Sequence, residues 1–515
     1  MGTSRQAVWR WLAAGVCLLA LGQAARADSL DEQRSRYAQI KQAWDNRQMD
    51  VVEQLMPTLQ TYPLYPYLQY RQLTDDLMNQ PTLTVQQFIQ ANPTLPPARS
   101  LTSRFVNELA RREDWRGLLA FSPQPPGSTE AQCNYYYAKF NTGDAQGAWQ
   151  GAKDLWQTGK NLPAACDRLF AAWRTSGAQD PLAYLERIRL AMKEGNTRLV
   201  SSLAGQLPSD YQTISSALVS LANDPNSVMT FVRSVGATDF TRQMAAVAFA
   251  SVAREDAENA RLMIPSLIQA QQLNDAQAQE LRDIVAWRLM GSDVTAEQAR
   301  WRDDAIMRSE STSLIERRVR MALGTGDRSG LNTWLARLPM EAKEKDEWRY
   351  WQADLLMERG REDEAKTILH SLMQQRGFYP MAAAQRLGED YPLRVDKAPT
   401  VNAALFEGAE MARVRELMYW GLDNTARSEW ANLVTSRSKQ EQAALARYAF
   451  DRNWWDLSVQ ATIAGKLWDQ LEERFPLAYK DLFARYVSDK AVPQSYAMAI
   501  ARQESAWNPK VRSPV

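Results

Sequence analysis

The sequence predicts an all-α protein. The chain of 515 residues carries 23 glycines and 23 prolines, a modest number for its length, and no sustained alternation of valine, isoleucine and threonine that would indicate strands. Most of it consists of amphipathic segments rich in alanine, leucine, glutamine, arginine and glutamate, which favour helices. A chain of this length is expected to divide into several domains.

Residues 1–27 are typical of a signal peptide for export. Two arginines precede an apolar run from Trp11 to Leu21, and Ala25-Arg26-Ala27 supplies the small residues that a signal peptidase reads. The run is too short to cross a bilayer, and no later segment approaches the roughly twenty apolar residues that a membrane-spanning helix needs. We therefore predict an exported protein without a membrane span, with Asp28 as its first mature residue.

The mature chain keeps two cysteines, Cys133 and Cys166. An even number of cysteines in an exported chain favours a disulfide bond between them. Closing that loop would stabilise the fold by roughly 3–4 kcal/mol on the chain-entropy model. Two buried free thiols are the alternative.

Several segments share the layout of a helix pair. In the segment from Trp348 to Met373, one helix is expected to end at Gly360 and the next to begin directly after it. Similar units surround Gly143-Asp144, Gly195-Asn196, Asp423-Asn424 and Arg452-Asn453. This layout is similar to a degenerate array of tetratricopeptide-type helix pairs, which stack into a superhelix.

Other features of the sequence exclude several classes of site. A serine or cysteine nucleophile would need the single histidine, His370, as its base, but His370 lies within a helical pattern and is interpreted as an ordinary helix residue. One histidine and two cysteines make a poor metal site, so we predict neither metal nor cofactor. The segment Gly324–Gly330 is close to a dinucleotide-binding loop, but it has Ser329 in place of the third glycine and follows a helix, so it predicts a helix-to-helix turn. The net charge of +1 gives no basic surplus for binding nucleic acid.

The clearest interruption of the helical pattern runs from Tyr391 to Pro399. Before it lies one very large helical region, residues 28–391. A smaller helical block follows over residues 400–470, and a third region covers residues 475–515.

The last region contains one short helix with a carboxylate. Pro493 can begin a helix without losing a backbone donor, and Asn508-Pro509 is a stop signal. Tyr496, Ile500 and Glu504 recur at four-residue spacing and share a face, which predicts a carboxylate on the apolar stripe. Burial there would disfavour the ionised form and help the group hold a proton for transfer. Periodicity alone equally allows a glutamate in a structural ion pair.

The segment Ala501-Arg502-Gln503-Glu504-Ser505-Ala506-Trp507-Asn508-Pro509 closely resembles the Glu-Ser signature of the lytic transglycosylases related to goose-type lysozyme. The rest of the chain is similar to a soluble member of that family from Gram-negative bacteria. The resemblance implies a periplasmic protein that acts on peptidoglycan glycan strands. It also implies a ring-like helical superhelix over 28–391, a helical linker domain over 400–470 and a lysozyme-like catalytic domain that begins within 475–515.

The resemblance also assigns roles to two residues. Glu504 would protonate the glycosidic oxygen between N-acetylmuramic acid and N-acetylglucosamine, and would then act as base towards the muramyl C6 hydroxyl, which leaves a 1,6-anhydro end. Ser505 would orient the glutamate or contact the substrate. A helix-terminal hydroxyl that bonds to local backbone is an equally good interpretation of Ser505.

The chain departs from the family after Asn508-Pro509. Members continue with a Gly-Leu-Met-Gln type segment, an Ala-Tyr-Asn-Ala-Gly type segment and a further tyrosine, all of which line the sugar cleft, and this sequence has none of them. We therefore expect a C-terminally truncated enzyme with little or no activity of its own.

A function of another class remains open. The chain would then be a non-catalytic periplasmic scaffold, a monomeric helical solenoid that binds peptidoglycan or cell-wall synthases. Aromatic clusters at Tyr62–Tyr67 and Tyr135–Tyr137 could stack on sugar rings, although packing between helices is the favoured interpretation of both clusters.

Overall fold

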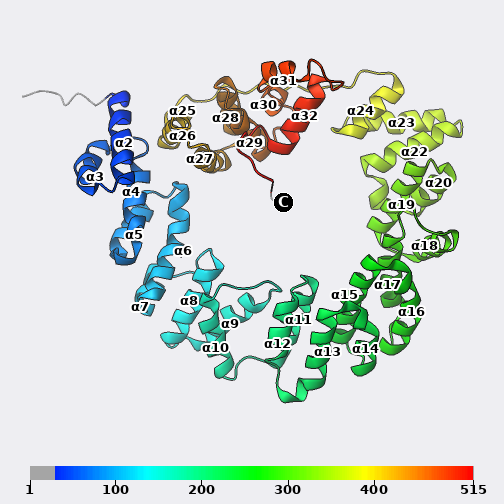
Figure 1. The fold of residues 1–515 in the computed structure, drawn as a ribbon. Helices are drawn as coiled ribbons and strands as arrows, with labels where there is room; N and C mark the ends of the chain where they lie inside the picture. Colours follow the sequence, from blue (N-terminus) through cyan, green and yellow to red (C-terminus); the bar gives the residue numbers. More distant parts are fainter. Residues whose placement is uncertain (1–28, 514–515) are drawn as a thin grey trace, which may run out of the picture. The chain divides into compact units, whose positions relative to one another are not determined.

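The computed structural model describes residues 29–513, and these residues form helices and no strand (Figure 1). The prediction of an all-α fold is therefore confirmed. None of the described helices is long and apolar enough to cross a membrane. The predicted signal peptide, residues 1–27, lies outside the described residues.

The chain divides into two compact units. The first unit combines the N-terminal residues up to Phe105 with the residues from Val395 onward, and the second unit runs from Val106 to Arg394. The helices of the first unit are α2 (Leu30–Asp45), α3 (Met49–Leu55), η1 (Met56–Leu59), α4 (Tyr65–Asp75), η2 (Leu77–Asn79), α5 (Thr82–Ala91), α6 (Pro96–Arg111, which continues into the second unit), α25 (Ala404–Glu407), α26 (Ala409–Tyr419), α27 (Asp423–Thr435), α28 (Lys439–Asp451), α29 (Trp455–Ala464), α30 (Leu471–Arg474), α31 (Lys480–Val487) and α32 (Gln494–Ser505).

The second unit is built of successive helices that pack against their neighbours in the sequence. They are α7 (Trp115–Phe121), α8 (Thr129–Asn141), α9 (Ala145–Trp156), α10 (Ala165–Thr175), α11 (Pro181–Lys193), α12 (Thr197–Ala204), η3 (Ser209–Tyr211), α13 (Gln212–Asn223), η4 (Pro225–Ser227), α14 (Val228–Ser234), α15 (Asp239–Glu255), α16 (Ala257–Gln271), α17 (Asp275–Arg288), α18 (Ala296–Arg308), α19 (Thr312–Thr325), α20 (Arg328–Arg337), α21 (Met340–Lys343), α22 (Asp346–Glu358), α23 (Glu362–Leu372) and α24 (Phe378–Leu387).

The predicted turns are confirmed at four of the helix pairs. The prediction at Asp423-Asn424 is wrong, because both residues lie in the first turn of α27 and Gly421, with a φ of 65°, forms the turn before it. Gly143, Gly195 and Gly360 each stand between two helices and have positive φ angles of 97°, 68° and 72°. Glycine adopts this left-handed conformation without the steric cost of a Cβ, so it ends one helix and lets the chain reverse into the next. Asn453 does the same between α28 and α29 with a φ of 58°.

Two further sequence interpretations concern the second unit, and both are confirmed. Gly326 forms the turn between α19 and α20, and the Asp327 carboxylate caps α20 by accepting from the Gly330 amide at 2.8 Å. His370 lies in α23 as an ordinary helix residue, half exposed, with its Nε2 2.8 Å from Glu389 Oε1.

A disulfide joins Cys133 of α8 to Cys166 of α10, with the two Cα atoms 4.8 Å apart. Both residues are fully buried in the core of the second unit. The predicted pairing is confirmed, and the alternative of two free thiols is wrong.

Replacing both Cys133 and Cys166 by alanine should lower the free energy of unfolding of the second unit by about 3–4 kcal/mol, because the unfolded chain regains the freedom of the loop that the bond closes. Urea unfolding of the variant and of the wild type, with and without reductant, measures this. The reduced wild type should match the variant. Equal stability of the oxidised and reduced wild type would contradict the prediction.

The predicted interruption between Tyr391 and Pro399 is also present. No helix occurs between the end of α24 at Leu387 and the start of α25 at Ala404. Within the first unit, the Asp396 amide donates to the Asp469 carbonyl at 2.7 Å. The extended segment is thereby fixed to the chain that follows α29.

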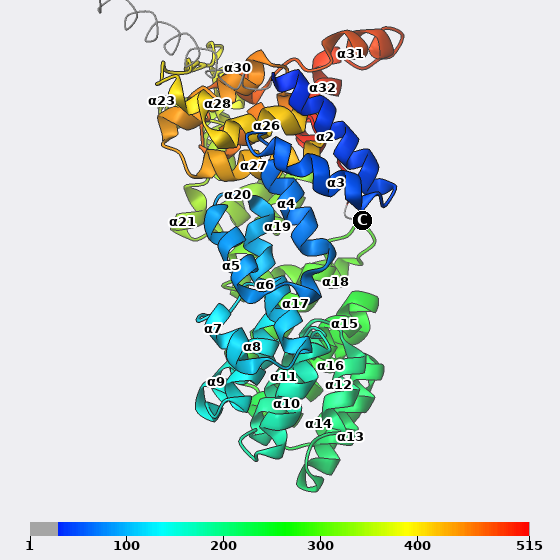
Figure 2. The same ribbon diagram turned by 90° about the vertical axis from the view of Figure 1, so that its left-hand side faces the viewer.

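The first unit joins its two chain segments through one core. Helices α2 to α4 lie beside α26 and α27 (Figure 2), and residues of both segments share a hydrophobic cluster that includes Tyr62, Leu64 and Leu417. Tyr62 and Leu64 are at most 1% exposed. Tyr135 in the second unit is buried as well. The favoured interpretation of the aromatic clusters, packing between helices, is therefore correct at these positions.

Candidate functional site

Glu504 lies in the last turn of α32. Pro493 stands at the N-cap of this helix, as predicted, and Ala506 and Trp507 end it because both have positive φ angles, 47° and 66°. Two consecutive non-glycine residues in the left-handed region are uncommon and require support from surrounding contacts.

The predicted burial of Glu504 is wrong for the described residues. Tyr496, Ile500 and Glu504 do share one face of α32, but that face is exposed, with Tyr496 at 61% and Ile500 at 47%. The buried side of the helix is instead the one that carries Met498, at 7% exposure. Both sides of the helix contain apolar residues. The four-residue spacing correctly predicts that Tyr496, Ile500 and Glu504 share a face, but it does not show which face is buried.

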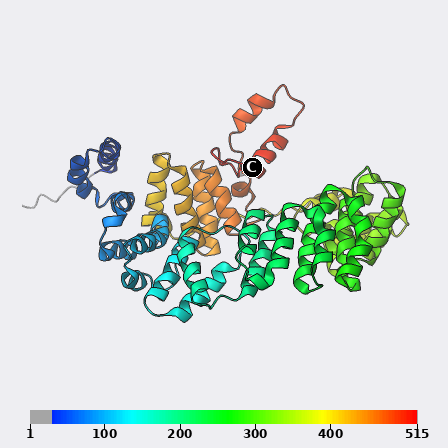
Figure 3. The same cartoon turned by 60° about the horizontal axis from the view of Figure 1, so that its bottom comes forward.

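A small apolar cluster holds α32 in place. Met498 and Trp507 pack with Val459 of α29 and Ala478, and Phe483 of α31 lies against this cluster. The Phe483 and Trp507 rings meet edge to face with centroids 5.9 Å apart, an arrangement that aromatic pairs favour. Helices α31 and α32 form a pair joined by a loop, drawn in orange and red in Figure 3.

Polar contacts fix the segment that follows Glu504. Arg427 of α27 donates from Nη2 to the Asn508 side-chain oxygen at 2.7 Å and from Nε to Asp456 at 2.6 Å. Lys510 pairs with Asp423 at 2.7 Å. These bonds tie the chain on the C-terminal side of Glu504 to the block of helices α27 and α29, and they provide the support that the left-handed turn requires.

Ser505 bonds to local backbone. Its hydroxyl donates to the Ala501 carbonyl at 2.6 Å and accepts from the Trp507 amide at 3.1 Å. Of the two interpretations of Ser505 from the sequence, the structure supports the helix-terminal hydroxyl. The hydroxyl thereby stabilises the turn immediately after Glu504.

A hollow of about 440 Å³ borders this turn. Its lining is almost wholly apolar and includes Tyr479, Phe483, Tyr486 and Trp507; Ser505 also lines it. The buried Trp507 Nε1 has no hydrogen-bond partner within the described residues. Glu504 does not line the hollow, so the structure does not combine the carboxylate and this cavity into one site.

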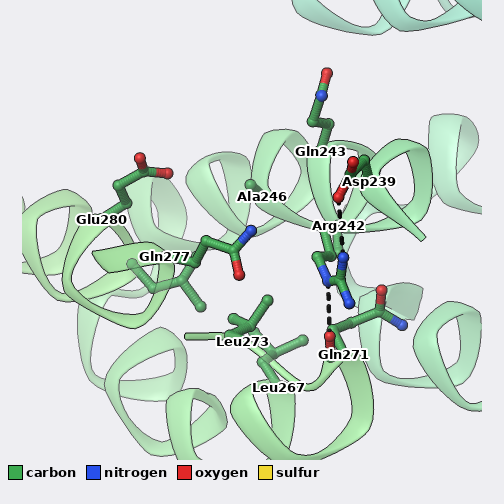
Figure 4. Close-up of a pocket in the computed structure, with 11 residues that line it drawn as sticks. Asp239, Arg242, Gln243, Ala246, Leu267, Gln271, Leu273, Gln277 and Glu280 are labelled. Carbon is green, nitrogen blue, oxygen red and sulfur yellow. Dashed lines mark hydrogen bonds and ion pairs between the residues drawn. The ribbon is translucent and has the colours of Figure 1, made fainter. Parts of the chain in front are cut away.

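A separate cavity of about 280 Å³ lies within the second unit, between α15, α16 and α17 (Figure 4). Its charged lining residues are Asp239, Arg242 and Glu280. Arg242 is already partnered, since it donates to Asp239 Oδ1 at 3.0 Å and to the Gln271 carbonyl at 2.9 Å. None of the residues that line this cavity is a candidate general acid or nucleophile from the sequence analysis. In the described part of the chain, no group of three or more histidine, cysteine, aspartate or glutamate side chains is placed to hold a metal ion.

No sequence pattern predicts the contacts that position α32. Arg427 and Asn508 are 81 residues apart. Such pairs follow no local spacing, so only the folded structure reveals them.

Comparisons with known proteins agree with the fold. A family model described as the soluble lytic murein transglycosylase L domain matches residues 405–471. The chain is 80% identical, over its whole length and 80% of the relative, to the soluble lytic murein transglycosylase of Escherichia coli K12. It is 78% identical, over the same shares, to the protein of that name from Salmonella typhimurium.

Solved structures give the same result. The crystal structure of the 70-kDa soluble lytic transglycosylase of Escherichia coli matches with a TM-score of 0.92 and 82% identity, over 95% of this chain and 79% of that chain. A complex of the 70-kDa soluble lytic transglycosylase with bulgecin A matches equally well, with a TM-score of 0.92. An inactive mutant of a Pseudomonas aeruginosa lytic transglycosylase, in which a glutamate is replaced by glutamine, matches with a TM-score of 0.80 and 26% identity over 93% of this chain and 78% of that chain. The chain therefore belongs to the soluble lytic murein transglycosylases.

Proposed function

We propose that this chain supplies the catalytic glutamate for cleavage of peptidoglycan glycan strands at the β-1,4 bond between N-acetylmuramic acid and N-acetylglucosamine, without hydrolysis and with 1,6-anhydro ends as the product. The observation that carries the proposal is the placement of Glu504. It stands exposed on α32, in the Glu-Ser segment, in a turn that Arg427 and Ser505 hold through hydrogen bonds. The family and the names of its members, lytic murein transglycosylases, support the same reaction.

Glu504 would serve as acid and then as base. As acid it gives its proton to the glycosidic oxygen of the leaving sugar, and as base it takes the proton of the muramyl C6 hydroxyl when that oxygen attacks C1. Because the nucleophile belongs to the same sugar, the attack is intramolecular and needs no water held by the enzyme. The inactive Pseudomonas aeruginosa mutant supports the need for a glutamate in a relative.

The exposed face around Glu504 is suited to receive a glycan. Tyr496 and Ile500 lie on that face, and together they offer apolar surface beside the carboxylate. A sugar ring lying across this surface would displace water from the reacting groups, which strengthens the electrostatic interactions at the site. Ser505 would act indirectly by fixing the turn that follows the glutamate.

The sequence-based domain limits are part of the same proposal. We infer a signal peptide over 1–27 and export to the periplasm, a superhelical region over 28–391, a linker domain over 400–470 and a catalytic region that includes 475–515. We further infer that the protein acts as a monomer and that cell-wall synthases are candidate partners.

The test measures products on isolated peptidoglycan sacculi. Two proteins are incubated with them, this chain and the same chain joined to the part of its Escherichia coli relative that lies outside the matched region. Mass spectrometry of the released fragments should show 1,6-anhydromuropeptides for the joined protein. Free reducing ends instead would indicate hydrolysis, and the absence of any product while the protein still binds sacculi would favour the scaffold function.

A further inference from the structure

The second unit contains a cavity that the proposed cleavage does not use. Its volume is about 560 Å³, and it lies between the end of α9, the segment from residue 157 to residue 164, and helices α10, α11 and α12. Buried aromatic side chains, Trp156, Phe170 and Tyr184, form part of its wall. It is twice the volume of the cavity in Figure 4, which is about 280 Å³.

A buried arginine without an acidic partner faces this cavity. Arg187 is 5% exposed, and its guanidinium lies 4.2 Å from the centre of the Trp156 ring. It donates to two backbone carbonyls, from Nε to Thr158 at 3.2 Å and from Nη2 to Lys160 at 3.5 Å, and no carboxylate of the described residues pairs with it. Burial lowers the pKa of Arg187 to about 10. A buried cation is costly unless an anion compensates it, so the cavity favours an incoming negative group.

One polar group in the cavity wall, the Gln179 amide nitrogen, lacks a partner in the described part of the chain. The Tyr184 hydroxyl donates to Gln179 Oε1 at 3.0 Å, and this bond orients the amide. Gln179 Nε2 is buried and has no hydrogen-bond partner within the described residues. Leaving a buried donor unsatisfied is unfavourable, and a ligand carbonyl oxygen would satisfy it.

The remaining walls define the kind of anion that fits. Leu162, Leu199 and Leu203 supply apolar surface, and Asp167 adds a carboxylate that could face a cation. A phosphate group is usually held by several converging backbone amides or charges. Arg174 also lines the cavity, but it is exposed and already donates from Nη1 to Gln206 Oε1 at 2.6 Å. One buried guanidinium, one unsatisfied amide donor and an aliphatic wall suit a carboxylate that belongs to a small chain with amide groups.

We propose that this cavity binds a short peptide by its free carboxylate. Arg187 faces the carboxylate, Gln179 Nε2 donates to a peptide carbonyl, and the leucines accept an aliphatic side chain. The site uses none of the residues around Glu504. Peptide binding in this cavity can therefore be tested independently of the proposed glycan cleavage.

The test is calorimetric titration of the full chain with N-acetyl-Lys-Ala-Ala, in its L-alanine and D-alanine forms, against the same peptides ending in a carboxamide. At least one carboxylate form should bind about 10-fold or more tightly than its carboxamide, because only the carboxylate compensates Arg187. Sodium phosphate is titrated as a further probe. Tighter binding of phosphate than of either peptide would overturn the assignment to a peptide.

Gln179→Glu is the sharpest variant. It keeps an acceptor for the Tyr184 hydroxyl, removes the Nε2 donor and adds a negative charge to the wall of the cavity that Arg187 also lines. Affinity for the carboxylate peptide should fall about 10-fold or more, while circular dichroism shows that the fold is kept. Arg187→Met should abolish binding, but it also frees the Thr158 and Lys160 carbonyls, so its fold is checked by circular dichroism.

The cavity in Figure 4 provides the matched control. Arg242→Gln removes a guanidinium that already has an acidic partner, and it should leave peptide affinity unchanged. Equal binding of the carboxylate and carboxamide peptides, full affinity in Gln179→Glu, or no binding at about 10 mM peptide would each overturn the proposal. Arg187 would then serve only to hold the segment before α10.

Discussion

Replacing Glu504 by glutamine should lower the rate of 1,6-anhydro product formation by about 100- to 10,000-fold. Glutamine keeps the size of the side chain and its place at the end of α32, but it has no proton to give to the glycosidic oxygen and cannot accept one from the C6 hydroxyl. A positioned acid–base group contributes a factor of this order. The measurement is the initial rate of 1,6-anhydromuropeptide release from sacculi, with the chain joined to the unmatched part of its relative.

The neighbouring Gln503→Ala variant is the matched control. Gln503 is exposed in the same turn of α32 and has no role in the proposed reaction, so its variant should retain the wild-type rate. Binding of Glu504→Gln to sacculi should also remain, since the variant loses transition-state interactions rather than substrate contacts. A Glu504→Gln rate within about 10-fold of the wild type would remove Glu504 from the catalytic role.

Local chemistry explains why the helices were predictable. Glycine at Gly143, Gly195 and Gly360 ends a helix because it accepts positive φ, and this preference acts within a few residues. Other local signals predicted the start of α32 after Pro493, which needs no backbone donor at a helix start, and the turn at Gly326. Sequence reasoning is reliable where the cause of a structural feature lies next to it in the chain.

The exposure of Glu504 shows where such reasoning stops. Tyr496 and Ile500 share its face, and the spacing rule found that face correctly. Which face becomes buried depends on Val459 and Phe483, which belong to other helices and meet Met498 on the opposite side. The spacing of residues within α32 contains no information about those partners.

Buried ion pairs were missed for a related reason. Arg34 of α2 donates to both carboxylate oxygens of Glu416 in α26, at 3.0 and 2.7 Å, and the two residues are 382 positions apart. Tyr62 donates to the same carboxylate at 2.7 Å. Nothing near Arg34 or Glu416 in the sequence distinguishes them from solvated charges. The bonds of Glu416 to Arg34 and Tyr62 show that the two chain segments of the first unit are joined by specific polar contacts as well as by apolar packing.

Another buried ion pair of the first unit, Arg413 with Glu429, leads to a strong prediction about stability. Glu429 of α27 accepts from Arg413 at 2.6 and 3.0 Å and from the Tyr67 hydroxyl at 2.8 Å, and its side chain is completely buried. Glu429→Gln leaves the Arg413 guanidinium buried beside a neutral amide. Removing one partner of a buried pair costs about 3–5 kcal/mol, and the first unit should lose this amount in its free energy of unfolding.

Hydrogen exchange measured by mass spectrometry during urea unfolding can assign the loss to the first unit. Peptides from α4, α26 and α27 should exchange faster in Glu429→Gln, because Tyr67 links α4 to the pair that joins α26 to α27. Glu410→Gln, which breaks the more exposed pair with Arg437, is the control and should cost about 1 kcal/mol or less.

The double variant Arg413→Met with Glu429→Leu should recover most of the loss, since it leaves no buried charge without a partner. If the double variant were as unstable as Glu429→Gln, the pair would stabilise the unit through its geometry and hydrogen bonds rather than by compensating the Arg413 charge.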